Sequence, residues 1–147
     1  MHDFKLKQLM KNTVLIVCLF TLQACSSEID VNNHDVETRR WYTTAQMIKG
    51  EQVFLKNCAS CHGIKAQATE NWRVSDKNGI YPPPPLNGTA HTWHHPINML
   101  KDTVANGTSR GMPAWKTTLN DEEIEATLAW IVSHWPDKVY NAWRSRH

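Results

Sequence analysis

The feature that most constrains this chain is the pentapeptide CASCH, from Cys58 to His62. Two thiols three positions apart on a helical turn lie on one face, so both reach the same edge of a flat cofactor. C-x-x-C-H is the attachment motif of c-type haem. In it Cys58 and Cys61 form thioethers with the two vinyl groups, and His62 lies beneath the iron as an axial ligand. The motif therefore predicts a fold built around one covalently bound haem c.

Two other interpretations of the motif explain the sequence less well. A thioredoxin-like redox pair needs a βαβ context, which this sequence lacks, and leaves His62 without a role. A zinc site normally needs two further ligands at matching spacing, and the chain contains no second C-x-x-C.

The N-terminus has the pattern of an export signal. Residues 13–22, TVLIVCLFTL, form an apolar run that is shorter than the ~20 residues of a membrane-spanning helix. The run is preceded by three lysines, Lys5, Lys7 and Lys11. This pattern predicts a cleaved signal peptide over residues 1–24.

The tetrapeptide LQAC at residues 22–25 resembles the lipobox of bacterial lipoproteins. The resemblance implies a lipid on Cys25 and attachment to a membrane on its periplasmic, extracytoplasmic side. Ser26 after the cysteine favours the outer membrane in a Gram-negative cell. An ordinary signal peptide, with Cys25 incidental, is the alternative. Residues 25–40 are polar, without a helical stripe, and predict a flexible tether to a haem domain at 41–147.

The charge of the exported chain excludes one class of partner. The signal holds three of the 16 basic and one of the 14 acidic residues, which leaves 13 of each after cleavage. A neutral chain has no strong field for nucleic acid, so we expect none as a partner. The tail at 135–147 mixes aromatic and basic residues, and we interpret it as a packing extension in preference to a docking surface.

Around the CASCH motif, residues 43–135 resemble the class I c-type cytochromes. Gly50 and Phe54 lie eight and four positions before Cys58, as in that family. The resemblance implies an all-α cytochrome c fold of about three to five helices wrapped around one haem. It also implies that the first and last helices cross at Gly50, where Trp130 approaches closely.

Two further motifs extend the resemblance. The stretch PPPPLNG matches a Pro-x-Leu-x-Gly pattern, which implies that the carbonyl of Pro84 orients the ring of His62. The stretch SRGMPAW resembles the distal loop of the family and implies Met112 as the second axial ligand of the iron. A thioether ligand raises the reduction potential relative to two histidines. Met47 and Met99 are better explained by packing.

Local signals predict three helices. The first covers residues 44 to about 56, and the second starts with Pro96 at its first helical position and ends near 106–107. The third follows Asn120 as N-cap, with Glu123 completing a capping box. Its apolar face consists of Ile124, Leu128, Ile131 and Trp135.

The stretch TAHTWHHP holds three histidines, His91, His94 and His95. The longer pattern PPLNGTAHTWHH resembles a subgroup of small exported cytochromes c. A mononuclear metal site needs a third ligand placed by the fold, so we expect hydrogen bonds to haem propionates or loop carbonyls instead. Our hypothesis is that His91 or Trp93 contacts a propionate.

Iron bound by His62 and Met112 has no open position for a substrate. We therefore predict an electron carrier and not an enzyme, which shuttles one electron between respiratory redox proteins through transient contacts. Three alternatives remain: a haem-based small-ligand sensor, a redox subunit of a larger enzyme, and a copper-binding or assembly protein that uses the histidine cluster.

Overall fold

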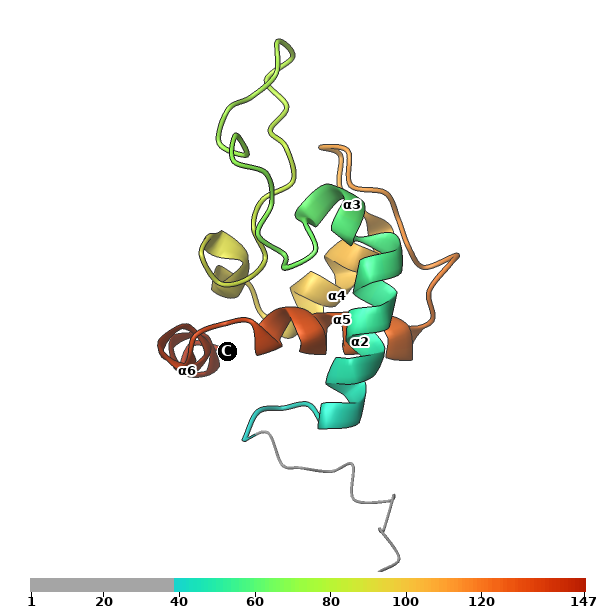
Figure 1. Cartoon of the computed structure of the whole chain (residues 1–147), viewed down its shortest axis with the longest axis vertical. Helices are drawn as coiled ribbons and strands as arrows, with labels where there is room; N and C mark the ends of the chain where they lie inside the picture. Colours follow the sequence, from blue (N-terminus) through green and yellow to red (C-terminus); the bar gives the residue numbers. More distant parts are fainter. Residues whose placement is uncertain (1–38) are drawn as a thin grey trace, which may run out of the picture. The chain divides into compact units, whose positions relative to one another are not determined.

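The computed structural model describes residues 39–147, so the predicted signal, Cys25 and tether positions 25–38 lie outside the described residues. In chain order the helices are α2 (Thr44–Asn57), α3 (Ala59–His62), the 3₁₀ helix η1 (His91–His94), α4 (Ile97–Asn106), α5 (Asp121–Ser133) and α6 (Asp137–Arg144) (Figure 1). Residues 39–147 contain no strand, which confirms the all-α prediction. No helix in this part of the chain is long and apolar enough to cross a membrane.

The core is centred where α2 crosses α5 (Figure 1). A Cβ on Gly50 would overlap the backbone carbonyl of Ala126, and it would lie 3.0 Å from Cβ of Trp130. The expected close approach is present, but its nearest obstacle is the Ala126 backbone and not the indole of Trp130. Phe54, which is fully buried, packs on the Trp130 ring with 4.3 Å between centroids.

Both helices of the crossing begin at reciprocal caps. The side chain of Thr43 accepts from the backbone N–H of Gln46 at the start of α2, and the Gln46 side chain accepts from the Thr43 N–H. Asn120 and Glu123 form the same arrangement at the start of α5, as the sequence predicts. Each box satisfies N–H groups that a helix end leaves without partners.

Two helix ends differ from the prediction. Pro96 is the N-cap of α4, with φ −68° and ψ 158°, and not its first helical residue. Trp135 lies outside α5, which ends at Ser133, so it does not continue the helical face. It is nevertheless 1% exposed. The chain turns at Pro136 into α6, because proline suits a helix start and not a helix interior.

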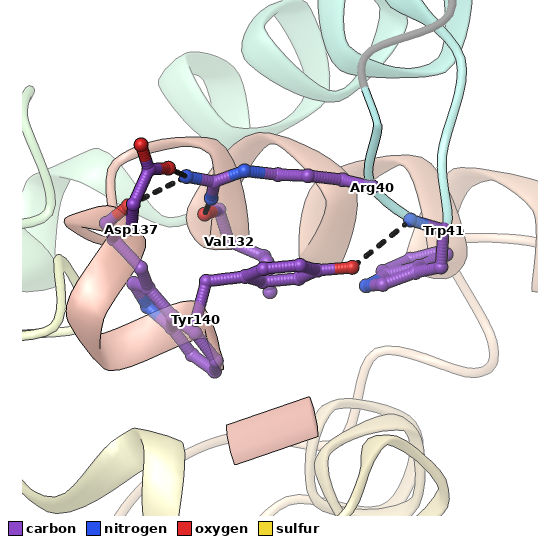
Figure 2. Close-up of polar contacts among 6 residues, drawn as sticks. Arg40, Trp41, Val132, Asp137 and Tyr140 are labelled. Carbon is purple, nitrogen blue, oxygen red and sulfur yellow. Dashed lines mark hydrogen bonds and ion pairs between the residues drawn. The ribbon is translucent and has the colours of Figure 1, made fainter. Parts of the chain in front are cut away.

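The N-terminal junction, residues 40 and 41 just before α2, is bound by residues near the C-terminus (Figure 2). The guanidinium of Arg40 donates to the carbonyl of Val132 at 2.7 Å and to the carboxylate of Asp137 at 2.7 Å. It also lies 4.5 Å from the ring centroid of Tyr140, whose hydroxyl accepts from the backbone N–H of Trp41 at 3.2 Å. Arg40, which the sequence assigns to the tether, is thus bound to the folded domain.

Candidate functional site

The CASCH motif lies where α2 gives way to α3. Cys58 caps the end of α2 and the start of α3, and its N–H donates to the carbonyl of Phe54 at 2.8 Å. Cys58 is half-buried, Cys61 is exposed, and both are free thiols. Burial, followed by the nearby Cys61, raises the pKa of Cys58 to about 11. Its thiol therefore stays protonated at neutral pH.

His62 is buried and oriented by a single polar contact. Its Nδ1 lies 3.0 Å from the carbonyl oxygen of Pro84. Because a carbonyl only accepts, Nδ1 carries the proton in the neutral ring, and Nε2 keeps its lone pair. Burial lowers the pKa of His62, and the hydrogen bond to Pro84 partly opposes this. The ring is therefore neutral at pH 7 and presents Nε2 as a metal ligand.

The loop after His62 is bound back to the segment that contains Pro84. The carbonyl of His62 accepts from the N–H of Ala68 at 2.7 Å. Ala66, fully buried and at φ 54°, accepts through its carbonyl from the N–H of Leu86 at 2.8 Å. These backbone bonds fix residues 84–86 beside the helical turn that carries the motif.

Met112 lies on a loop that is closed against the end of α4. Its carbonyl accepts from the N–H of Thr108 at 2.9 Å, and its own N–H donates to the Thr108 hydroxyl at 3.3 Å. A Cβ on Gly107 would come within 2.7 Å of the carbonyl carbon of Pro113, so only glycine fits there. The half-buried Met112 packs against the apolar core, whereas Met99 is 49% exposed.

The histidines of TAHTWHHP form η1 and the residue after it. The rings of His91 and His95 lie 5.9 Å apart, and the ring of His94 packs edge-on against Trp93 at 4.2 Å. Burial lowers the pKa of His95, and so do His91, His94 and His147. Within residues 39–147, no three His, Cys, Asp or Glu side chains are arranged to hold a metal ion. The propionate contacts of His91 and Trp93 stay a prediction.

Sequence reasoning missed the hydrogen bonds by which two tryptophans of the tail contact this region. The indole Nε1 of Trp135 donates to the carbonyl of Leu86 at 2.8 Å, and that of Trp143 donates to the carbonyl of His95 at 2.9 Å. The spacing of aromatic residues around Pro136 in the tail was the available signal, but it indicates burial and not a particular acceptor.

The residues at this site fit haem c. Two free thiols stand three positions apart on one helical turn, and the neutral ring of His62, whose Nδ1 is bonded to Pro84, keeps Nε2 as a nitrogen that could bind iron. Met112 supplies a soft thioether on a loop of fixed backbone.

Comparison with known proteins gives the same family. Residues 45–131 match the family model described as cytochrome C oxidase, cbb3-type, subunit III. The chain is 31% identical over 86 residues to the cbb3-type cytochrome c oxidase subunit CcoP of Azospirillum sp. (strain B510), covering 58% of this chain and 28% of that protein. It is 33% identical over 82 residues to cytochrome c6 of Bryopsis maxima, covering 56% of this chain and 84% of that protein.

A third relative is the cbb3-type cytochrome c oxidase subunit FixP of Bradyrhizobium diazoefficiens, 28% identical over 99 residues, with 65% of this chain and 29% of that protein covered. The chain thus spans less than a third of the length of the cbb3 subunits that it matches. No solved structure gives a significant match.

Proposed function

Since the chain belongs to the class I c-type cytochrome family represented by subunit III of cbb3-type cytochrome c oxidase, we propose that it is a respiratory electron carrier tethered to a membrane on the periplasmic side. Its cofactor is covalently bound haem c, and its domain is an electron-transfer domain. When bound, haem c supplies an iron that alternates between ferrous and ferric states and so holds one electron.

The chain's own residues attach, orient and enclose this group. Cys58 and Cys61 would provide the thiols for the two thioethers, and His62 and Met112 would provide the ligands that hold the iron. Pro84 keeps the proton on Nδ1 of His62, which leaves the lone pair of Nε2 available to bind iron. If His62 and Met112 both held the iron, no position on it would be left for a substrate, and electron transfer would be the chemistry that the group supplies.

The observation that carries this proposal is the 3.0 Å contact between Nδ1 of the buried His62 and the carbonyl of Pro84. It leaves a neutral imidazole with one free nitrogen next to two thiols that are not paired with each other. Structural packing alone gives no reason for an oriented, buried histidine at this position of a C-x-x-C-H motif.

Spectroscopy of the purified haem protein tests the ligation. We expect a low-spin spectrum with the weak near-infrared methionine–iron band in the ferric state, and loss of that band in Met112→Leu. Met99→Leu is the matched control and should keep the band, because Met99 lies half-exposed on α4. High-spin iron that binds CO without denaturant in the wild type would instead support a ligand sensor.

Tethering through Cys25 has a separate test. The wild-type protein should partition into detergent and label with palmitate, whereas Cys25→Ser should do neither. Cys18→Ser, a change within the apolar run of the signal, is the control and should behave as wild type. Release of the wild type as an unlabelled, water-soluble protein would contradict the lipid anchor and leave the electron-transfer proposal intact.

A second candidate function is favoured by the names of two of the relatives, CcoP and FixP, which are subunits of an oxidase. In that case the protein is a redox subunit of a larger respiratory enzyme. Purification from membranes in mild detergent distinguishes the two: a stoichiometric complex with an oxidase supports the subunit, and recovery of the cytochrome alone supports the mobile carrier.

A further inference from the structure

Three consecutive carbonyls next to the motif histidine accept hydrogen bonds from three different parts of the chain. The carbonyl of Pro84 accepts from His62, and that of Pro85 accepts from the hydroxyl of Thr92 at 3.2 Å. The third, of Leu86, accepts from Nε1 of Trp135 at 2.8 Å. The position of the Pro84 carbonyl therefore depends on its neighbours as well as on His62.

The sequence of this segment explains why it needs side-chain donors. Residues 82–85 are four prolines, which have no backbone N–H to donate. The N–H of Leu86, bonded to the carbonyl of Ala66, is the first backbone donor after them. Proline also fixes φ, so the run is stiff and a displacement at Leu86 moves Pro84 as well.

Trp135 is itself held firmly. It is 1% exposed, its backbone N–H donates to the carbonyl of Val132 at 3.1 Å, and its ring meets that of Trp143 at 5.8 Å. Gly88, at φ 88°, leaves the space that Trp135 occupies, because a Cβ there would lie 3.2 Å from Cδ1 of the indole. The bond to Leu86 is partly buried, with its donor residue almost wholly out of water, so losing it leaves a carbonyl without a protein partner.

We propose that Trp135 is a positioning residue for the haem-binding histidine: by holding the carbonyl of Leu86, it fixes the carbonyl of Pro84 against Nδ1 of His62. This inference rests on the proposed function, in which His62 is an axial ligand. A hydrogen bond from Nδ1 to a carbonyl increases the basicity of the ring as a ligand and favours ferric iron. Trp135 thereby lowers the reduction potential of the haem.

Two substitutions remove the donor while keeping an aromatic ring. Trp135→Phe is the simpler one. Replacement of Trp135 by benzothienylalanine exchanges the indole N–H for sulfur and preserves the shape, so a folded variant is available if phenylalanine leaves a destabilising gap. Trp143→Phe is the matched control, because it removes the equivalent donor to His95, nine residues beyond Leu86.

The measurements are the reduction potential of the haem protein and the exchange rate of the His62 Nδ1 proton in the ferrous form by NMR. We expect both Trp135 variants to have a higher potential than wild type and an exchange rate about threefold to tenfold faster, the factor for one neutral hydrogen bond. Trp143→Phe should lower thermal stability and leave both quantities unchanged.

A wild-type potential and exchange rate in the benzothienylalanine variant would overturn the inference, and so would an equal shift in Trp143→Phe. Failure of the proposed function has a different signature. The ferrous wild-type spectrum would then lack the shifted ring protons of an iron-bound His62, whatever the variants do.

Discussion

The crossing of α2 with α5 and the packing of α6 on residues 86–95 both stabilise the haem domain, but through different interactions. At the crossing, backbone lies against backbone at Gly50, and apolar rings fill the space around it. Around α6, buried aromatic rings are joined by side-chain N–H groups that donate to backbone carbonyls, from Arg40, Trp135 and Trp143. The crossing depends on the close fit of the two helices at Gly50. The α6 region depends in addition on backbone carbonyls that accept hydrogen bonds from side chains.

This difference predicts which substitutions each region tolerates. A bulky side chain in the crossing has no place to move, because its obstacle is a main-chain carbonyl. A lost donor in the α6 region leaves a carbonyl without its partner, which costs less and leaves the fold in place.

Gly50→Leu should have the largest effect. Even a Cβ overlaps the carbonyl of Ala126, so the helices must separate and expose Phe54 and Trp130. Overpacking typically costs about 1–3 kcal/mol, and a backbone obstacle puts this change at the upper end or beyond. The check is the melting temperature of the haem-bound protein, compared with that of Glu51→Leu on the exposed side of α2. An unchanged melting temperature would refute the crossing.

Arg40→Met should have the next largest effect. The substitution keeps an aliphatic chain but removes the bonds to the carbonyl of Val132 and to Asp137, and it removes the cation above Tyr140. Hydrogen bonds from a charged group contribute about 1.5–3 kcal/mol. Urea unfolding measures the loss, with Arg39→Met as the control. Equal stability of the two variants would show that the junction does not support α6.

Asn120→Ala tests the helix that the two regions share. It removes the acceptor for the N–H of Glu123 at the start of α5. Loss of an N-cap costs about 0.5–2 kcal/mol. Urea unfolding should show a loss in that range, with Asn120→Asp retaining stability because aspartate also caps. A larger loss than in Arg40→Met would reverse the proposed ranking of the contacts.

The sequence predicts these regions unequally, for a physical reason. The caps at Asn120 and Glu123 and the turn at Gly107 are signals contained within a few residues, and the structure has them. Trp135 and Leu86 lie 49 positions apart, and Arg40 and Val132 lie 92 apart. A tryptophan in a tail indicates burial, but its acceptor is decided by how the chain turns at Pro136.

The same limit applies within the site. The motif at 58–62 and the pairing of His62 with Pro84 follow from a family pattern. The structure places Nδ1 of His62 3.0 Å from the carbonyl oxygen of Pro84. The histidines at 91, 94 and 95 had no such guide in the sequence, because residues of the C-terminal segment 135–147 contribute to their surroundings. Of these histidines, His95 is thus bound to the C-terminal segment, which carries His147 as a fourth imidazole.

The smallest expected effect is a pH dependence of the α6 region. Burial and three neighbouring imidazoles lower the pKa of His95 below its value in the unfolded chain, about 6.5. Protonation therefore favours the unfolded chain, so the stability is fully present above that pH and falls as the pH drops through 6.5. The guanidinium of Arg146 lies 5.2 Å from the centroid of the Trp93 ring, which packs against His94.

His95→Gln isolates this effect, because it removes the titrating ring and keeps the backbone carbonyl that accepts from Trp143. Between pH 7.5 and 5.5, the unfolding free energy of the wild type should fall more than that of the variant. His134→Gln is the control, since the ring of His134 lies against Trp130 of α5. If wild type and His95→Gln lose stability in parallel, the acid sensitivity comes from elsewhere, and the α6 region is held by its tryptophan donors independently of the histidines.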